Sequence, residues 1–236
     1  MASTIQLART IARSQQFIRL SPLTFAANTA NDPAFSNADW VKQEILAPPN
    51  TYRWNRTGAT PTNPTFTTVI GQTDYPVSLS NFGFIEKAVA YDPNNAFASY
   101  ELQNGLIYGA DTLPNQPARI AAQYDNDAGQ VTFRIFPAPD AVYNIVVEWQ
   151  ASASLFTSTT NTWTPIPDYL SYIYNTGFDA KSYEYMSDPR YSGTMQLFYT
   201  QIANVAEGLS ATERNIWLAD KLASVREMAA AQQGRR

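Results

Sequence analysis

Residues 131–181 constrain the fold most, because this one stretch contains two strand patterns, a turn-rich crossing and the start of a long helix. Val131, Phe133 and Ile135 fall on one face of the first strand, since strand side chains alternate at a period of two, and the alternation recurs at 143–149. Residues 137–140, Pro-Ala-Pro-Asp, are of types that favour turns, so we predict that the two strands form a hairpin. This order of patterns indicates a β module joined to a helical module.

Short strand patterns also fill the region before this hairpin. They recur at 66–69, 75–79, 84–91, 98–102 and 118–124, with a weaker pattern at 105–110, and turn-forming residues separate them at 71–74, 92–95 and 125–129. Together with the hairpin they make seven or eight short strands at a spacing of roughly ten residues, which is typical of a β-sandwich or barrel. We therefore predict that residues 57–165 form a β-sandwich module.

Helical patterns occupy both ends of the chain. Leu7, Ala8, Ile11 and Ile18 share roughly one helical face, which favours a packed N-terminal helix over a targeting segment. A second short helix, capped at Ser36 or Asn37, runs to Leu46. We assign residues 1–56 to an N-terminal helical segment that packs with the C-terminal helices.

Residues 166–236 are predicted to form a C-terminal helical module and a docking tail. The first helix starts at Pro167 and ends at the breaker 187–189, and the second carries an apolar stripe over 195–209. Residues 210–213, Ser-Ala-Thr-Glu, form a capping box for a third, long helix. The last turns, 229–236, have few large side chains and end in two arginines, so they read equally as an idle tail or as a docking helix whose partner groove is absent.

The chain contains no cysteine and no histidine. This excludes disulfides, thiolate nucleophiles, the usual zinc sites and Ser-His or Cys-His catalysis. A glycosidase that uses two carboxylates survives this exclusion, and Asp140 and Asp168 are its candidates. Each follows a proline and suits a turn or a helix start better than catalysis. We therefore expect no enzyme, and neither cofactor nor metal.

Two groups of residues could bind a ligand, but each also fits an ordinary structural role. Asp125 and Asp127 precede Gly129 as in a calcium loop, but the other ligands of such a loop are missing, which favours an Asx turn. Large aromatic side chains could stack on sugars, although aromatics on strands and at junctions usually belong to the core. The aromatic residues in question are Tyr52, Trp54, Trp149 and Trp163.

The formal charge of −4 is distributed unevenly along the chain. Residues 1–56 carry six Lys and Arg against three Asp and Glu, residues 57–170 carry three against ten, and residues 171–236 carry seven against seven. The acidic middle region, and the isoelectric point of the whole chain near 4.8, do not fit strong specific binding to nucleic acid. No run reaches the length of a membrane span, so no membrane is expected as a partner.

An ordered set of short segments resembles the head-to-tail adaptor, or connector, proteins of tailed bacteriophages over residues 36–222. The segments lie at 66–68, 71–75, 82–87, 136–140, 143, 163–168, 172–175 and 207–210. Each is weak alone, and the resemblance rests on their order and spacing. The family's fold, a β-sandwich joined to a helical bundle, agrees with the elements predicted above.

The resemblance implies a structural virion protein at the head–tail junction, made in the cytoplasm of a bacterial host. Such adaptors form a ring beneath the portal, usually of twelve copies, extend the DNA channel without binding DNA specifically, and meet the tail or the next neck protein. Their C-terminal helix commonly docks into the portal. Carried onto this chain, portal docking is expected of Trp217, Leu218, Lys221, Val225, Arg226, Met228, Arg235 and Arg236. A tail-completion or stopper ring protein is the nearest alternative, and a carbohydrate-binding β module is a more distant one.

Overall fold

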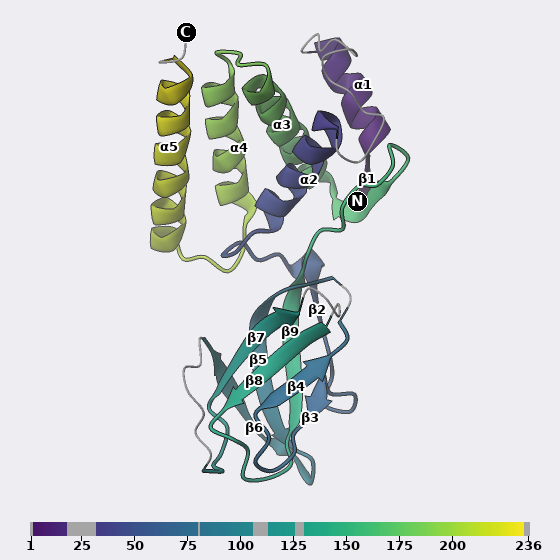
Figure 1. The fold of residues 1–236 in the computed structure, drawn as a ribbon, viewed down its shortest axis with the longest axis vertical. Coiled ribbons are helices and arrows are strands. Elements are labelled where there is room, and N and C mark those ends of the chain that lie inside the picture. Colours follow the sequence, from purple (N-terminus) through teal and green to yellow (C-terminus); the bar gives the residue numbers. More distant parts are fainter. Residues whose placement is uncertain (1, 18–31, 80, 106–112, 126–129, 234–236) are drawn as a thin grey trace. The chain divides into compact units, whose positions relative to one another are not determined.

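The computed structural model describes residues 2–17, 32–79, 81–105, 113–125 and 130–233 (Figure 1). The chain divides into two compact units, one made of residues 1–54 and 153–236 and the other of residues 55–152. The first unit, here the helical unit, contains all five α-helices of the described residues, and the second, the β module, contains a sheet of eight strands. The predicted α+β class is therefore confirmed.

The β module is an open sheet folded over its own core, so that Phe66 and Phe82 of one layer pack on Phe133 of the other. Its strands are β2 (Arg56–Gly58), β3 (Phe66–Thr67), β4 (Asp74–Val77), β5 (Phe82–Asp92), β6 (Asn95–Asn104), β7 (Arg119–Asp125), β8 (Gln130–Phe136) and β9 (Asn144–Ala151). They follow the order β2-β9-β5-β6-β7-β8-β4, with β3 also on β9. All pairs are antiparallel except β6 with β7. The expected number of strands is confirmed, β5 and β6 pair across the predicted turn at 92–95, and most of the weaker pattern at 105–110 lies outside the described residues.

The hairpin predicted from residues 131–149 is wrong, although both of its strands exist. β8 pairs with β7 and β4, whereas β9 pairs with β2, β3 and β5, so three strands of the sheet lie between them. The segment 137–140 does not close a tight turn, because the Asn115 amide donates to the Ala138 carbonyl at 2.8 Å and the Asp140 amide donates to the Asn115 carbonyl at 3.1 Å. This segment carries the chain from one layer of the sheet to the other.

The strand patterns at 66–69 and 75–79, which the turn residues 71–74 separate, do not form strands that pair with each other. β3 pairs with β9 and β4 pairs with β8. The turn between them does form, since the Gln72 amide donates to the Val69 carbonyl at 3.0 Å and Gly71 takes a φ of +78°, which a glycine adopts without steric cost. β3 ends at Thr67, so Val69 and Ile70 lie in the turn rather than in the sheet.

The helical unit opens with a strand and not with a helix. β1 (Ala2–Gln6) pairs with β10 (Thr162–Pro167), and α1 (Leu7–Phe17) follows β1 directly. The packed N-terminal helix is confirmed, because Leu7 and Ile11 are buried, and Ile18 lies outside the described residues. The β module ends at Ser152 rather than at residue 165, since β10 finds its partner strand inside the helical unit.

Four further helices complete this unit: α2 (Pro33–Leu46), α3 (Asp168–Tyr185), α4 (Tyr191–Val205) and α5 (Ala211–Gln233). α2 starts earlier than expected, with Asp32 as its N-cap and Pro33 in its first turn. Pro167 is the N-cap of α3 rather than its first residue. The predicted break after α3 is confirmed at Ser187, which takes a φ of +54°. In Figure 1, α3, α4 and α5 stand side by side, with α5 at the edge.

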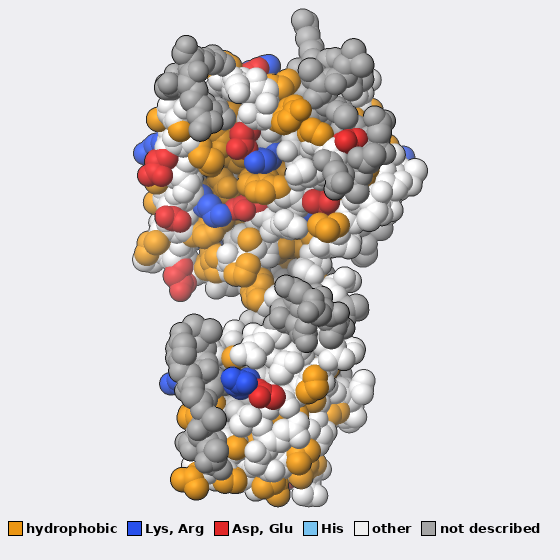
Figure 2. Space-filling model, in the orientation of Figure 1, with side chains coloured by type: hydrophobic (Ala, Val, Ile, Leu, Met, Phe, Trp, Pro, Cys, Tyr) orange, Lys and Arg blue, Asp and Glu red, His pale blue; other side chains and the backbone are white. Residues whose placement is uncertain are grey.

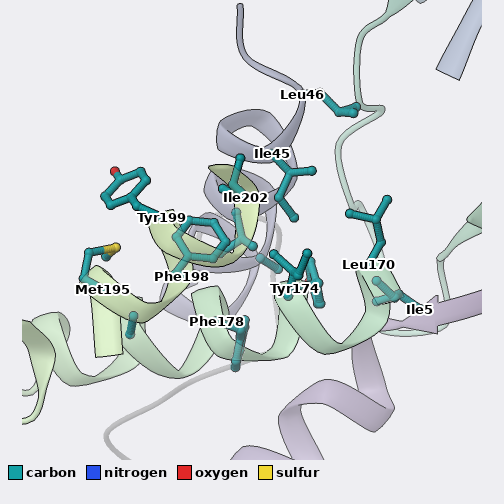
Figure 3. Packing of buried hydrophobic residues seen from close by; sticks show 14 of the residues in the cluster. Ile5, Ile45, Leu46, Leu170, Tyr174, Phe178, Met195, Phe198, Tyr199 and Ile202 are labelled. Carbon is teal, nitrogen blue, oxygen red and sulfur yellow. The ribbon is translucent and has the colours of Figure 1, made fainter. Parts of the chain in front are cut away.

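The core of the helical unit is formed mainly by aromatic and aliphatic side chains of α2, α3 and α4 (Figure 3). α3 comes close to α4 and α2 at Gly177, where an added Cβ would lie 2.6 Å from Phe198 Cε2 and 2.8 Å from Val41 Cγ1. Both neighbouring side chains are fully buried, so neither can move aside without disturbing the core. The glycine therefore permits the close packing of these three helices.

Alanine at Gly177 is expected to lower the free energy of unfolding by about 1–3 kcal/mol, because overpacking outweighs the gain in helix propensity. Gly193 in α4 provides the matched control, since nothing lies within 4 Å of the Cβ it would acquire. Gly193→Ala should raise stability by about 0.5 kcal/mol. Urea unfolding of the two variants measures whether each substitution lowers or raises the free energy of unfolding. A stabilising Gly177→Ala would contradict the close packing.

A partly buried ion pair joins α1 to α3. The Arg13 guanidinium lies 2.9 Å from the Asp179 carboxylate, to which the Ser14 hydroxyl donates at 3.0 Å. Burial raises the pKa of Asp179, and the opposing effects of Arg13 and Ser14 are smaller. The Arg13 guanidinium therefore favours the charged form of this carboxyl group, which burial disfavours.

Arg13→Met is expected to raise the pKa of Asp179 further and to destabilise the helical unit in a pH-dependent way. A carboxyl group whose pKa is raised by folding contributes stability below its unfolded pKa of about 4, and this contribution is lost as pH rises through the folded pKa. The loss of unfolding free energy should reach about 1–3 kcal/mol at pH 7.5, because Asp179 is then charged and unpaired. It should be much smaller at pH 4. Equal losses of unfolding free energy at the two pH values would show that the destabilisation does not come from the loss of the ion pair.

Candidate docking surface on the C-terminal helix

α5 begins at the predicted capping box. The Glu213 carboxylate accepts a hydrogen bond from the Ser210 amide at 2.9 Å, and the Glu213 amide donates to the Ser210 hydroxyl at 3.3 Å. The hydrogen bonds from Ser210 lower the pKa of Glu213, so the box stays intact at neutral pH. This reciprocal arrangement satisfies two backbone groups that a helix start would otherwise leave unpaired. It fixes where α5 starts independently of any partner.

The inner face of α5 packs on the helical unit, mainly on α4. Val225 is fully buried, while Trp217 and Leu218 are half-buried against the core. The Trp217 ring meets the Tyr199 ring edge-on at a centroid distance of 6.0 Å. Lys221 forms an ion pair with Glu44 of α2. Four of the eight predicted docking residues therefore hold α5 to its own unit.

The outer face of α5 is exposed along its length. Ile216 is 66% exposed and Met228 is 41% exposed, although the Met228 sulfur also accepts a hydrogen bond from the Tyr191 hydroxyl at 3.7 Å. Arg226 is exposed as well. Arg226 and Met228 are thus the predicted docking residues that the structure leaves accessible, and Arg235 and Arg236 lie outside the described residues. We define the outer face of α5 by Ile216 and Arg226, because Met228 lies about 120° around the helix from Ile216, on the side that meets Tyr191 of α4.

Ile216 was not among the expected docking residues. In the sequence it stands beside Trp217, and helical spacing from Trp217 through Lys221 to Val225 selects one face. Ile216 lies about 100° from Trp217 around the helix, which places it outside that stripe. The sequence offers no signal that marks Ile216 as exposed and functional, since single exposed apolar side chains are common on protein surfaces.

The remaining sequence candidates are not brought together as sites. Asp140 belongs to the β module, where its carboxylate accepts a hydrogen bond from the Tyr143 hydroxyl at 2.9 Å, whereas Asp168 is the first residue of α3 in the helical unit. Asp125 ends β7, and Asp127 lies outside the described residues. Among the residues described, no group of three or more acidic side chains has a geometry that could hold a metal ion.

The four aromatic residues considered for sugar stacking are packed within the protein. Tyr52 and Trp149 are buried, and the rings of Trp54 and Trp163 lie 6.2 Å apart beside Tyr52. Tyr52, Trp54 and Trp163 belong to the core of the helical unit, while Trp149 belongs to the core of the β module. They do not share one exposed surface.

The β module is acidic, and part of its positive charge is already neutralised within it. Residues 55–152 contain nine Asp and Glu and four Lys and Arg. Arg134 forms a two-pronged ion pair with Asp74 at 2.7 and 3.0 Å, and Arg56 pairs with Glu86. Such a surface repels phosphate and does not hold it.

Comparisons with known protein families and curated proteins identify no family for this chain. No protein-family model matches the sequence, and no curated protein matches it significantly. None of the described helices is both long enough and apolar enough to cross a lipid bilayer.

Proposed function

We propose that the protein is a structural virion component that forms a ring beneath the portal, joins the head to the tail and extends the DNA channel. This proposal rests mainly on the structure of α5. It is a long helix that is capped internally, held by one face to the helical unit and exposed along the other. A helix of this kind can enter a groove of a partner without any unfolding of the unit that presents it.

The charge of the β module supports the same proposal. A channel that conducts DNA during ejection must not bind phosphate tightly, since cationic walls would hold the DNA backbone. The excess of carboxylates over cations in residues 55–152 meets this requirement. In such a ring each subunit presents two different faces to its neighbours.

Docking on the portal is assigned to the outer face of α5. Ile216 supplies apolar contact area, and Arg226 supplies a cation that can pair with a partner carboxylate. Trp217, Leu218, Lys221 and Val225 act indirectly, because they hold α5 in place on the helical unit.

The proposal is tested by native mass spectrometry of the purified protein mixed with the portal protein of the same virus. Several copies of the chain should bind each portal ring, with the number set by the portal's symmetry. A single copy per portal, or no complex at micromolar concentration, would reject the connector role.

A further inference from the structure

Three loops meet at one end of the β module. β9 runs from Asn144 to Ala151, and the chain leaves the module just after its C-terminal end, so Asn144 marks the opposite end. The pairing of Thr67 with Asn144 brings the loop after β3 to this end. The segment before β9, residues 137–143, lies there too, and the segment around Asn115 is bonded to it through Ala138 and Asp140.

Hydrogen bonds hold these loops in a defined shape. The Tyr75 hydroxyl accepts from the Val69 amide at 3.1 Å and donates to the Gln72 carbonyl at 2.8 Å. The Thr68 hydroxyl accepts from the Tyr143 amide at 2.7 Å and lies 3.1 Å from the Ala141 carbonyl. The Gly71 amide donates to the Pro139 carbonyl at 2.9 Å. The loops are therefore preorganised, which lowers the entropic cost of binding a partner.

Large apolar side chains project from this scaffold into solvent. Val69 is 55% exposed, Ile70 is 60% exposed and Val142 is 45% exposed. Figure 2 shows hydrophobic side chains gathered at the lower end of the β module. Turn positions normally carry Gly, Asn, Asp, Ser or Pro, and contiguous exposed apolar side chains mark interaction sites. We refer to Val69, Ile70 and Val142 as the apolar loop end.

An acidic pocket of about 390 Å³ adjoins the apolar loop end. Its lining includes the carboxylates of Asp92 and Asp140 and the rings of Tyr100 and Tyr143, which meet edge-on at 6.0 Å. Burial raises the pKa of both tyrosines, so their hydroxyls stay neutral and the charge of the pocket comes from the carboxylates. Two carboxylates beside aromatic rings form a favourable environment for a guanidinium or ammonium group.

The negative charge beside the apolar loop end indicates which class of partner fits this surface. Membrane-surface segments combine apolar side chains with Lys, Arg or Trp, whereas this surface combines them with carboxylates, which anionic headgroups repel. A protein surface that is apolar at its centre and carries Arg or Lys at its edge is complementary both to the apolar loop end and to the acidic pocket.

We propose that the apolar loop end docks a protein partner whose contact surface is apolar and carries an Arg or Lys that enters the pocket of Asp92 and Asp140. This site is separate from the outer face of α5, and its role does not depend on portal docking. The two surfaces give the chain two independent attachment points.

The experiment selects peptides from a random twelve-residue phage-display library on the immobilised full chain and then measures the affinity of the enriched peptide as a synthetic probe. The enriched peptides should combine aliphatic or aromatic residues with Arg or Lys. Val69→Ser/Ile70→Ser/Val142→Ser should weaken binding of the synthetic peptide at least about tenfold. Asp92→Asn/Asp140→Asn should weaken it about three- to tenfold and reduce its salt dependence.

Ile216→Ser is the matched control, because Ile216 is about as exposed as Ile70 but lies in the other unit. It should leave peptide binding unchanged. The absence of enriched peptides, a lack of Lys and Arg among them, or equal affinity of the loop variants would each overturn the proposal. Co-sedimentation of the wild type with vesicles of 70% phosphatidylcholine and 30% phosphatidylserine, lost in the loop variants, would also overturn it, because the occupant would then be a membrane. Self-association that the loop variants abolish would overturn it too, because the occupant would then be a second copy of the chain.

Discussion

Replacing Ile216 by Asp and Arg226 by Glu together is expected to weaken binding to the portal at least about 30-fold while the chain stays folded. An apolar or Arg side chain at the centre of an interface often accounts for about 2 kcal/mol of binding free energy, which corresponds to this factor. Ile216 is 66% exposed and Arg226 is also exposed, so neither substitution disturbs packing within the helical unit. Surface plasmon resonance against immobilised portal rings measures the change.

Val225→Ala is the complementary variant for this prediction. Val225 is fully buried between α5 and the rest of the helical unit, so its truncation should lower the free energy of unfolding by about 1–3 kcal/mol. Below the melting temperature it should leave portal affinity nearly unchanged, because its side chain does not reach the outer face. If Val225→Ala abolished binding and the double variant did not, the docking face would have been assigned to the wrong side of α5.

The second large effect is expected from Phe133→Ala in the β module. Phe133 is fully buried, stacks on Phe66 at 5.5 Å and meets Phe82 edge-on at 5.7 Å. Truncating a buried phenylalanine costs about 3–5 kcal/mol, which is a large part of the stability of a domain of this size. The melting temperature of the β module should fall by roughly 15–30 °C.

The helical unit should not share this loss, because its core cluster is separate from that of the β module. Calorimetry should show one transition moved down and the other nearly unmoved, and limited proteolysis near the lower transition should cut first within residues 55–152. Phe198→Ala, in the core of the helical unit, should reverse the pattern. Equal shifts of a single transition in both variants would mean that the two units unfold together.

The elements that sequence reasoning located correctly depend on local interactions. The capping box at Ser210 and Glu213 is complete within four residues, and the helix break at Ser187 follows from the residues around it. In each case the residues that determine the structure are neighbours in the chain, so their pattern is sufficient.

The errors concern pairing between distant segments. The alternation at 131–135 and 143–149 indicates which side chains face a core, but it does not indicate the neighbouring strand. The same limit applies to α5. The spacing of Trp217, Lys221 and Val225 identifies an apolar face, yet only the packed bundle shows that its own unit covers that face. Val69 and Ile70 have strand-forming side chains, and only the register of β3 on β9 shows that they lie in an exposed turn.

The central claim is that the outer face of α5 attaches a ring of this protein to a portal. The most direct measurement is an electron cryomicroscopy map of the complex formed by the purified chain and the portal protein of the same virus. The account predicts a ring of subunits in which α5 of each copy lies against the portal with Ile216 and Arg226 at the contact. A map without a ring, or a ring in which α5 faces away from the portal, would contradict it.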